Sequence, residues 1–303
     1  MNSNSESLGV VTLNWKRASD TIACIESIKL QTSTDVKYIV VDNGSGDDEI
    51  ELLKRALPNT NILSLKENLG FAAGFNAGIQ RALSLCCDLI LILNNDTIAC
   101  PNMLSALLEE IQSPGIGVVA PVIYYHSNPT VIWSAGGNLL PSLPTTLMAH
   151  SRSGNLKEPI RRTFLSGCCL LIRREVLSSI GGLDERFFMY YEDLDFFVRL
   201  LETRWIAKVI PDAKLLHKVS MSSGGEISEK ERYLMAYSSV VYYRKHINQR
   251  NLILVIPYRV TSFVMNILRM LVGGNLKGIK AYYRGTVDAL HAISEQSNCT
   301  KVL

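Results

Sequence analysis

The stretch Leu89-Ile90-Leu91-Ile92-Leu93-Asn94-Asn95-Asp96 decides the expected fold of this 303-residue chain. Five consecutive apolar residues are typical of a parallel strand at the centre of a sheet, where both faces are covered. The run then changes at once to polar residues, and its last member, Asp96, is a carboxylate. In doubly wound α/β sheets, ligands bind at the carboxyl ends of the strands. We therefore predict a central strand over 89–93 with a functional acid at its tip.

Apolar runs and helical patterns alternate on both sides of this strand. Further strands are predicted at 8–13, 38–41, 61–65, 117–122, 168–172 and 206–210. Between them, apolar residues recur at helical spacing, as in Ile22, Ile25 and Ile28. The looser stretch 126–162 predicts a long loop or a small hairpin over a site. This alternation predicts an α/β fold with a doubly wound, mostly parallel central sheet.

Polar residues follow four of the predicted strands, namely Asn14, Asp42, Asn68 and Asp96. Because the carboxyl ends of parallel strands meet at one edge of a sheet, we expect these residues to converge on one cleft. Asp42 opens the sequence Asp-Asn-Gly-Ser, in which Asn-Gly is by itself a strong turn signal. Beside Thr12 and Asn14 on the adjacent strand, the Asp42 carboxylate is also a suitable acceptor for a nucleobase N–H group. Both interpretations stay open.

Gly70, Gly74 and Gly78 are spaced by four in a predicted helix that runs from about 68 to 85. Such a glycine face favours close packing of the helix on its neighbours. The N-terminal amides of a helix also form an anion site, and small side chains let a diphosphate or a sugar approach closely. The pattern therefore predicts close packing, with a nucleotide site as a second use.

The tip at Asn94-Asn95-Asp96 holds a single acid, and its alternative interpretation is an ordinary end of a strand. One carboxylate is sufficient for Mg²⁺ or Mn²⁺ when substrate phosphates and waters fill the remaining positions. His217 would add a nitrogen ligand, which favours Mn²⁺ somewhat. A lone histidine is, however, more often structural than a ligand.

A second acidic cluster, Glu192-Asp193-Leu194-Asp195, opens a predicted amphipathic helix over 192–203. Its apolar stripe is expected to face the core and comprises Leu194, Phe197, Val198 and Leu201. Its polar stripe comprises Glu192, Asp195, Arg199 and Glu202. Asp195 and Arg199 stand at i, i+4 and predict a salt link.

Asp193 differs from the other acids of this helix, because it lies on the first turn at the border of the apolar stripe. Shelter by Phe196 and Phe197 is expected to raise the pKa of its carboxyl, which suits a general base. The alternative is that Asp193 caps the N-terminus of the helix.

The C-terminal part of the chain differs in charge from the rest. Residues 1–227 hold 20 Lys and Arg against 24 Asp and Glu, whereas residues 228–303 hold 11 against 4. The mostly apolar stretch 252–272 contains Arg259 and Arg269, each costing about 2.5–3.5 kcal/mol near the middle of a bilayer. We therefore predict an interfacial helix pair on anionic lipid rather than a spanning helix. A helical hairpin packed on the main domain is the alternative.

The cysteines and the N-terminus point to a reducing compartment. Seven cysteines form no C-x-x-C pair, and most lie in apolar runs. The N-terminal MNSNSESLG lacks the charged-then-apolar pattern of a secretory signal. We expect buried reduced thiols in a cytoplasmic protein.

Seven segments, taken in this order, resemble the inverting family-2 glycosyltransferases with the nucleotide-diphospho-sugar (GT-A) fold. The resemblance is to the rhamnosyltransferase-like and galactofuranosyltransferase-like branch above all. The segments are VVTLNW (10–15), VDNGS (41–45), NLGFAAGFN (68–76), LNNDT (93–97), SGCCLLIRR (166–174), GGLDERFF (181–188) and YEDLD (191–195).

The resemblance implies a role for each candidate residue. Residues expected to hold the donor nucleotide or its sugar are Thr12, Asn14, Asp42, Asn68, Gly70, Asn76 and Asn95. Asp96 resembles the metal-binding acid of the family, and His217 resembles a late histidine that completes a site for Mg²⁺ or Mn²⁺. Asp193 resembles the catalytic base. Residues expected on the acceptor side are Gly167, Glu192 and the loop 126–165.

The domain organisation follows from the same resemblance. Residues 1–225 are expected to form the GT-A domain, with 1–122 as the nucleotide-sugar half and 123–225 as the acceptor and catalytic half. Residues 226–303 are expected to form a helical, basic extension that contacts the membrane surface. The chemistry requires Asp96 and Asp193 to face a single sugar-sized gap.

The expected activity is inverting transfer of a sugar from a UDP- or dTDP-sugar to a lipid-linked or polysaccharide acceptor. L-rhamnose from dTDP-L-rhamnose is the first donor expected, at the cytoplasmic face of a bacterial membrane, in cell-surface glycan synthesis. A homo-oligomer stays open, and no nucleic-acid partner is expected.

Alternatives to this activity remain at the level of sequence. One is galactosyl, galactofuranosyl or N-acetylhexosaminyl transfer from a UDP-sugar. Another is a non-catalytic subunit that binds sugar nucleotides or glycans. A sugar-nucleotide pyrophosphorylase is disfavoured, because the chain lacks an early Gly-rich basic loop that would grip a triphosphate.

Overall fold

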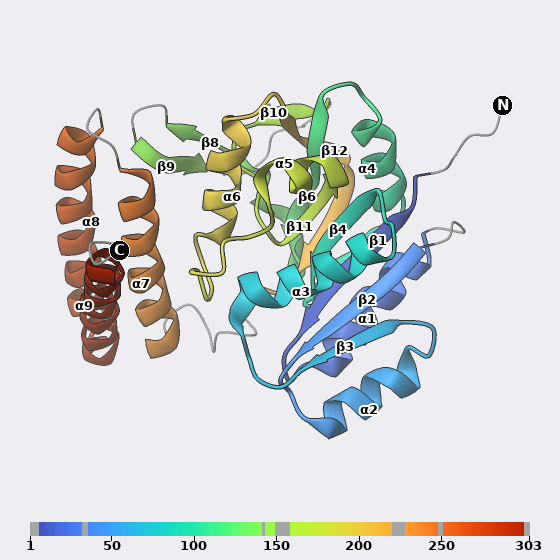
Figure 1. Ribbon diagram of the computed structural model, residues 1–303, viewed down its shortest axis with the longest axis horizontal. Coiled ribbons are helices and arrows are strands. Elements are labelled where there is room, and N and C mark those ends of the chain that lie inside the picture. Colours follow the sequence, from blue (N-terminus) through green and yellow to red (C-terminus); the bar gives the residue numbers. More distant parts are fainter. Residues whose placement is uncertain are drawn as a thin grey trace.

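The computed structural model describes residues 6–31, 36–140, 143–148, 158–219, 228–247 and 251–299. Figure 1 shows an α/β body built around a central sheet, with a layer of three long helices beside it. The body contains the strands and the shorter helices. The three long helices come last in the chain.

The central sheet is mixed, with its strands in the order β10, β12, β6, β11, β4, β1, β2, β3. β4, β1, β2 and β3 are parallel neighbours, and β12 is parallel to β6. β11 runs antiparallel to both β4 and β6. The strand bounds are β1 Leu8–Asn14, β2 Val36–Asn43, β3 Asn61–Leu65, β4 Leu89–Asn94, β6 Ile116–Tyr125, β10 Ile160–Arg162, β11 Cys169–Arg173 and β12 Ile206–His217.

Helices cover both faces of this sheet, because successive strand residues point to opposite sides. On one face, Val10 and Leu91 pack with α1 (Ala18–Lys29), α2 (Asp47–Ala56) and α4 (Met103–Ile111). On the other face, Val11 and Ile92 pack with α3 (Gly70–Ser84), α5 (Arg174–Ile180) and α6 (Glu192–Leu201). The predicted doubly wound α/β fold is confirmed, with β4 fully buried from Leu89 to Leu93 as a central strand.

Four short elements are not predicted by the sequence: β5 (Thr97–Ala99), β7 (Asn128–Ser134), β10 and α5. β5 pairs with β12 and β7 pairs with β6, so tertiary contacts hold both strands. β5 has only 3 residues, too few for an alternating pattern to stand out, and β7 begins with Asn128-Pro129, which is by itself a turn signal. Within 126–162, β8 (Gly137–Leu140) and β9 (Leu143–Met148) form a hairpin, while 141–142 and 149–157 lie outside the described residues.

The C-terminal region is helical, as predicted, with α7 (Glu229–His246), α8 (Leu252–Val272) and α9 (Leu276–Cys299). α7 packs against α9 and also against the segment that leads into α6. There, Phe187 and Tyr191 share an apolar cluster with Tyr242 and Tyr243. The predicted domain boundary at 225/226 falls within 220–227, outside the described residues.

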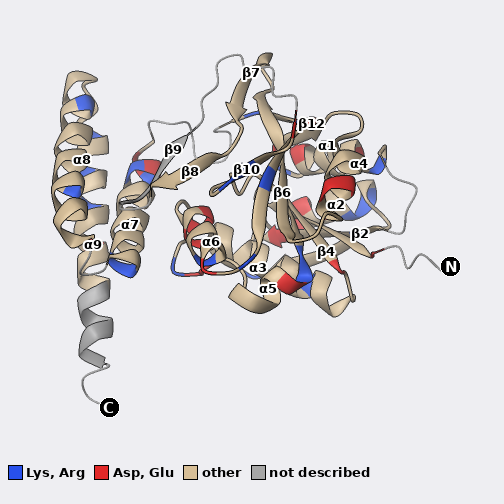
Figure 2. Cartoon of the chain, turned by 90° about the horizontal axis from the view of Figure 1, so that it is seen from above, with Lys and Arg blue, Asp and Glu red and all other residues tan. Residues whose placement is uncertain are grey.

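α8 is the one helix in the described part of the chain that is long and apolar enough to cross a membrane. Only 6% of its most apolar 18-residue window is buried in the structure. Figure 2 marks the basic residues along this helix in blue. Of these, Arg259 turns toward α7, donating to the Ser239 hydroxyl over 2.8 Å and stacking on the Tyr243 ring, whereas Arg269 is exposed.

Candidate active site

The carboxyl ends of β1 and β2 and the residues after β4 meet in a buried chain of polar side chains. Asn14 donates to the Asp42 carboxylate over 2.8 Å and accepts from the Thr21 hydroxyl over 2.7 Å. Asn95 in turn donates to Thr21 over 3.0 Å. Thr12 lies two residues further inside β1 and is fully buried. Three of the predicted donor residues, Asn14, Asp42 and Asn95, therefore belong to one network.

The start of α3 does not present the free amides that an anion site requires. The amide of Leu69 donates to the Asn43 side chain over 2.9 Å, and the amide of Gly70 donates to the Asn68 side chain over 2.9 Å. The amide of Phe71 donates to the carbonyl of Phe188 over 2.6 Å. These three amides are occupied by the protein itself. The prediction of an open anion site here is wrong, because tertiary contacts satisfy the helix end.

Gly70 and Asn76 were also predicted to contact the donor. Both lie on α3, where this helix contacts the segment that leads to α6. Gly70 has φ +88°, and a Cβ on it would lie 2.4 Å from the Phe188 carbonyl oxygen, so only glycine fits this approach. Asn76 accepts from the Leu183 amide over 2.9 Å and donates to its carbonyl over 2.8 Å. The structure gives both residues a positioning role, and their contact with a donor stays a prediction.

Asp193 lies on the first turn of α6, beside the predicted acceptor residue Gly167. One carboxylate oxygen accepts from the Gly167 amide over 3.1 Å, and the other accepts from the Leu194 amide over 2.8 Å. Burial raises the pKa of the Asp193 carboxyl, although both amides oppose that shift. The N-cap of α6 is Tyr191, so the alternative that Asp193 caps the helix is wrong.

Glu192 is buried, with 6% of its surface exposed, and its Oε2 atom has no hydrogen-bond partner. Burial and then the neighbouring Asp193 charge raise the pKa of this carboxyl well above its usual range. Asp195 is also fully buried, while Leu201 is 47% exposed. The predicted stripes of this helix are therefore wrong at these three positions. At Asp195 the reason is α7, because Lys245 and His246 of that helix lie against its carboxylate.

Asp96 and His217 form a second buried pair at the same edge of the sheet. The His217 Nε2 atom lies 3.2 Å from the Asp96 carboxylate. The indole ring of Trp133 packs edge-on against the imidazole. Burial would lower the pKa of His217, but Cys168 and Asp96 raise it to about 10. The two predicted metal ligands are thus brought into contact from β12 and from the turn after β4.

The Gly167-Cys168 turn connects the two acidic centres. Its Gly167 amide binds Asp193, and the Cys168 carbonyl accepts from the Asn94 amide over 2.9 Å at the end of β4. The Cys168 side chain also interacts with His217. Asp193 and the end of β4 are therefore linked through this turn, and the placement of Asp96 and Asp193 on a single sugar-sized gap stays a prediction.

Two side chains of this region were not predicted from the sequence. Asn43 donates to the Asn68 side chain over 3.1 Å and to the Gly70 carbonyl over 3.0 Å, which ties β2 to α3. Thr21 lies within α1 and links Asn14 to Asn95. Thr21 sits one helical turn inside an ordinary amphipathic helix, so no local pattern distinguishes it. Asn43 belongs to a strong turn signal that hides its second use.

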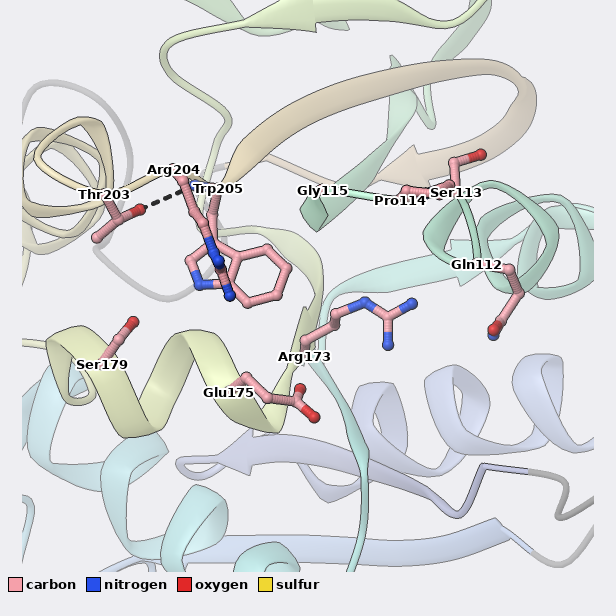
Figure 3. A pocket seen from close by; sticks show the side chains of 10 residues that line it. All are labelled: Gln112, Ser113, Pro114, Gly115, Arg173, Glu175, Ser179, Thr203, Arg204 and Trp205. Carbon is pink, nitrogen blue, oxygen red and sulfur yellow. Dashed lines mark hydrogen bonds between the residues drawn. The ribbon is translucent and has the colours of Figure 1, made fainter.

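A hollow of about 570 Å³, drawn in Figure 3, is lined by none of these residues. It is lined by Gly115 and Trp205, which precede β6 and β12, and by Arg173, which ends the antiparallel β11. It therefore opens at the opposite edge of the sheet. The Arg173 guanidinium is occupied by Glu6 and by the carbonyls of Ile111 and Ile116.

Comparison with known proteins identifies the family to which this arrangement belongs. Residues 7–181 match the family model described as Glycosyl transferase family 2. An N-acetylglucosaminyl-diphospho-decaprenol L-rhamnosyltransferase of Mycobacterium tuberculosis is 29% identical over 240 residues, covering 72% of this chain and 78% of the relative. The galactofuranosyltransferase GlfT1 of the same organism is 26% identical over 221 residues, covering 70% of each chain.

Solved structures share the fold. The mannosyltransferase PcManGT from Pyrobaculum calidifontis, in complex with GDP-Man and Mn²⁺, superposes with a TM-score of 0.57 at 13% identity, covering 99% of this chain and 82% of that one. GalNAc-T7 with UDP, GalNAc and Mn²⁺ gives a TM-score of 0.58 at 13% identity, covering 80% of this chain and 50% of that one. Both are GT-A glycosyltransferases. With this fold, and with a family model matching more than half its length, the chain belongs to glycosyl transferase family 2 and is a glycosyltransferase.

Proposed function

We propose that the chain is an inverting transferase that moves L-rhamnose from dTDP-L-rhamnose to a lipid-linked glycan in cell-surface polysaccharide synthesis. The observation that carries the proposal is Asp193, a sheltered carboxylate of raised pKa held by the Gly167 amide at the edge where Asp42 and Asp96 also lie. The rhamnosyltransferase from Mycobacterium tuberculosis supports the choice of sugar and acceptor. UDP-galactofuranose is the second donor to test, because of the similarity to the galactofuranosyltransferase.

The chemistry follows from the two sides of the site. Asp193 accepts the proton of the acceptor hydroxyl as that oxygen attacks the anomeric carbon from the face opposite the diphosphate. A raised pKa lies closer to neutral pH, and a carboxylate with such a pKa accepts a proton more readily than an ordinary one. The Asp42 carboxylate, at the strand tips beside Asn14, is the acceptor that we propose for the N–H edge shared by thymine and uracil. Its oxygens accept from Asn14 and from the Ser45 amide, so a base would share or displace one of these contacts.

A divalent cation fits the other side. Asp96 and His217 supply an oxygen and a nitrogen within 3.2 Å of one another, and the nearby Asn94 Oδ1 atom is buried without a partner. In the described part of the chain, no three His, Cys, Asp or Glu residues form a metal cluster by themselves. The diphosphate of the donor and water must therefore supply the remaining ligands. When bound, the cation would neutralise the charge that develops on the departing nucleotide.

Contact with a membrane surface is part of the proposal. α8 exposes an apolar stripe at helical spacing, formed by Ile253, Ile256, Val260, Val264, Leu268 and Val272. α9 adds the exposed cations Lys277 and Arg284. An amphipathic surface of this kind is suited to the headgroup layer of anionic lipid. It would bring the enzyme to a lipid-linked acceptor at the inner face of the cell membrane.

The proposed function is tested by Asp193→Asn, which keeps the shape of the side chain but removes the base. We expect transfer from dTDP-L-rhamnose to fall by about 10²–10⁴-fold, since general base catalysis typically contributes that much. Donor affinity, measured by calorimetry, should not change. Glu202→Gln is the matched control, because it removes an exposed carboxylate from the end of the same helix. Near-normal turnover in Asp193→Asn would exclude Asp193 as the base.

Metal dependence is tested by chelation. We expect EDTA to abolish transfer and Mn²⁺ or Mg²⁺ to restore it, because Asp96 and His217 alone cannot neutralise the leaving diphosphate. Asp96→Asn should weaken Mn²⁺ binding in the presence of dTDP, measured by calorimetry, whereas Asp88→Asn should leave it unchanged. Full activity after exhaustive chelation would contradict this part of the proposal.

A further inference from the structure

Asp195 is a fully buried carboxylate that the proposed chemistry does not use. It stands two residues after Asp193, and an arginine, a lysine and a histidine surround it. Arg199 donates to one of its oxygens over 2.8 Å, while Lys245 and His246 lie 2.5 Å and 2.9 Å from the other. Burial would raise the pKa of this carboxyl, but these partners hold it below its usual range. Asp195 is therefore a charged group at the centre of a closed network.

The partners of Asp195 come from different parts of the fold. Arg199 also donates to the carbonyls of Ile180 and Gly182, in the turn after α5. Lys245 also binds the Asp184 carboxylate over 2.6 Å. α6, the 180–184 segment and the C-terminal end of α7 are thus joined through one buried charge. Removing one partner from a buried charge strongly destabilises the folded state. Moving any of the three elements away would break such a contact, so they are held in one relative position.

The turn immediately before Asp193 depends on the same helix, α7. Tyr190 and Tyr191 both adopt left-handed φ values, +71° and +69°, which are strained for residues with a side chain and persist only where the surroundings impose them. The Tyr191 ring packs against Tyr242 of α7, and Ser238 of α7 donates to the Met189 carbonyl over 2.8 Å. α7 therefore supports the backbone from which the catalytic helix begins.

We propose that Asp195 is a positioning residue that fastens α6 to α7 and so sets the position of Asp193. The inference rests on the proposed role of Asp193 as the base. Misplacement of a catalytic group by about 1 Å can cost on the order of 10²-fold in rate. α7 holds Asp195 through Lys245 and His246, so this C-terminal helix supports the helix that carries Asp193.

The test is Asp195→Asn, which keeps the volume of the side chain and removes its charge. We expect kcat per donor-binding site, counted by calorimetry with dTDP, to fall by about 10–100-fold. KM for the donor should stay within about twofold, because a change confined to the placement of the base acts on turnover rather than on ground-state binding. Glu202→Gln again serves as the matched control, and it should change neither quantity.

A role in stability alone would lower the fraction of folded protein but leave kcat per donor-binding site unchanged, and that result would overturn the inference. If Asp195→Asn does not fold, Lys245→Met provides the second variant. It keeps Arg199 and His246 on Asp195, and we expect a smaller loss of kcat, of about three- to tenfold, again without a change in KM for the donor. Normal kcat in Lys245→Met would equally overturn the inference.

The inference and the proposed function fail in different ways. An inactive Asp193→Asn together with a normal Asp195→Asn would remove only the positioning role. A fully active Asp193→Asn would remove the base itself, and the positioning role would fall with it. A double variant, Asp195→Asn with Lys245→Met, should lose less activity than the product of the two single losses, since the two residues share one contact.

Discussion

At the scale of single residues, the adjacent acids Glu192 and Asp193 differ in their hydrogen bonds. The amides of Gly167 and Leu194 donate to Asp193 and favour its charged form. Glu192 has a buried Oε2 atom with no partner, and the neighbouring charge of Asp193 opposes its ionisation. We therefore expect Asp193 to ionise first, which leaves a neutral acid beside the proposed base.

The variant Glu192→Gln should stabilise the protein increasingly as the pH rises. The pKa of Glu192 is higher in the folded chain than in the unfolded one. Folding stability is therefore lost as the pH rises from about 4.3, the ordinary value for Glu, toward that raised pKa. The limiting slope is about 1.4 kcal/mol per pH unit, and glutamine removes it.

Urea unfolding of Glu192→Gln and of the parent at about pH 5 and about pH 8 measures this difference. Glu51→Gln, on an exposed position of α2, is the control and should give no pH-dependent change. Parallel stability curves for Glu192→Gln and the parent would show that the buried carboxyl carries no raised pKa.

At the scale of elements, α3 is fixed by close contact along its length and by hydrogen bonds at its start. A Cβ atom on Gly78 would lie 2.2 Å from a Val11 methyl group and 2.9 Å from one of Val41. One on Gly74 would lie 2.5 Å from a Leu13 methyl group. The glycine spacing is thus explained by packing of the helix on β1 and β2, the first of the two uses predicted for it.

Gly78→Ala should destabilise the protein. Alanine gains about 0.5–1 kcal/mol in helix propensity over glycine, but overpacking a close-packed core typically costs about 1–3 kcal/mol. Because Val11 is fully buried and β-branched, it has little freedom to move away. Gln80→Ala, an exposed position on the same helix, is the control and should stay within about 0.5 kcal/mol. Urea unfolding measures both, and a Gly78→Ala variant as stable as the parent would contradict the packing argument.

At the scale of the whole molecule, the C-terminal helices have two faces with different uses. The inner face of α7 meets α6 through Tyr242, while the outer stripe of α8 is apolar and exposed. Exposed apolar surface of this extent is unusual for a soluble protein and marks a site of interaction.

Binding to vesicles tests this surface. We expect the protein to sediment with vesicles that contain phosphatidylglycerol, and Val264→Glu with Leu268→Glu to weaken binding at least about tenfold, since each buried apolar side chain contributes about 1.5–3 kcal/mol. Leu30→Glu, which charges an exposed leucine at the end of α1, is the control and should bind normally. If the double variant binds vesicles as well as the parent does, the lipid contact does not involve this stripe of α8.

Much of the fold could be predicted because its signals are local. The run Leu89–Leu93 is apolar throughout, and a strand covered on both faces needs no partner to be recognised. The strand tips Asn14 and Asp42 could be placed together because parallel strands end at one edge. Elements such as β5 could not be predicted, because three residues carry no period and the strand exists only by pairing with β12.

By itself, the sequence determined the order of the strands and helices and the residue types at the strand tips, since hydrophobic period and chain reversal are local properties. Only the tertiary structure decided which polar groups remain available. It occupied the amides at the start of α3 with Asn43, Asn68 and Phe188, and it buried both Glu192 and Asp195. Burial and hydrogen bonding depend on residues far apart in the chain, and no periodicity along one helix can reveal what covers its other face.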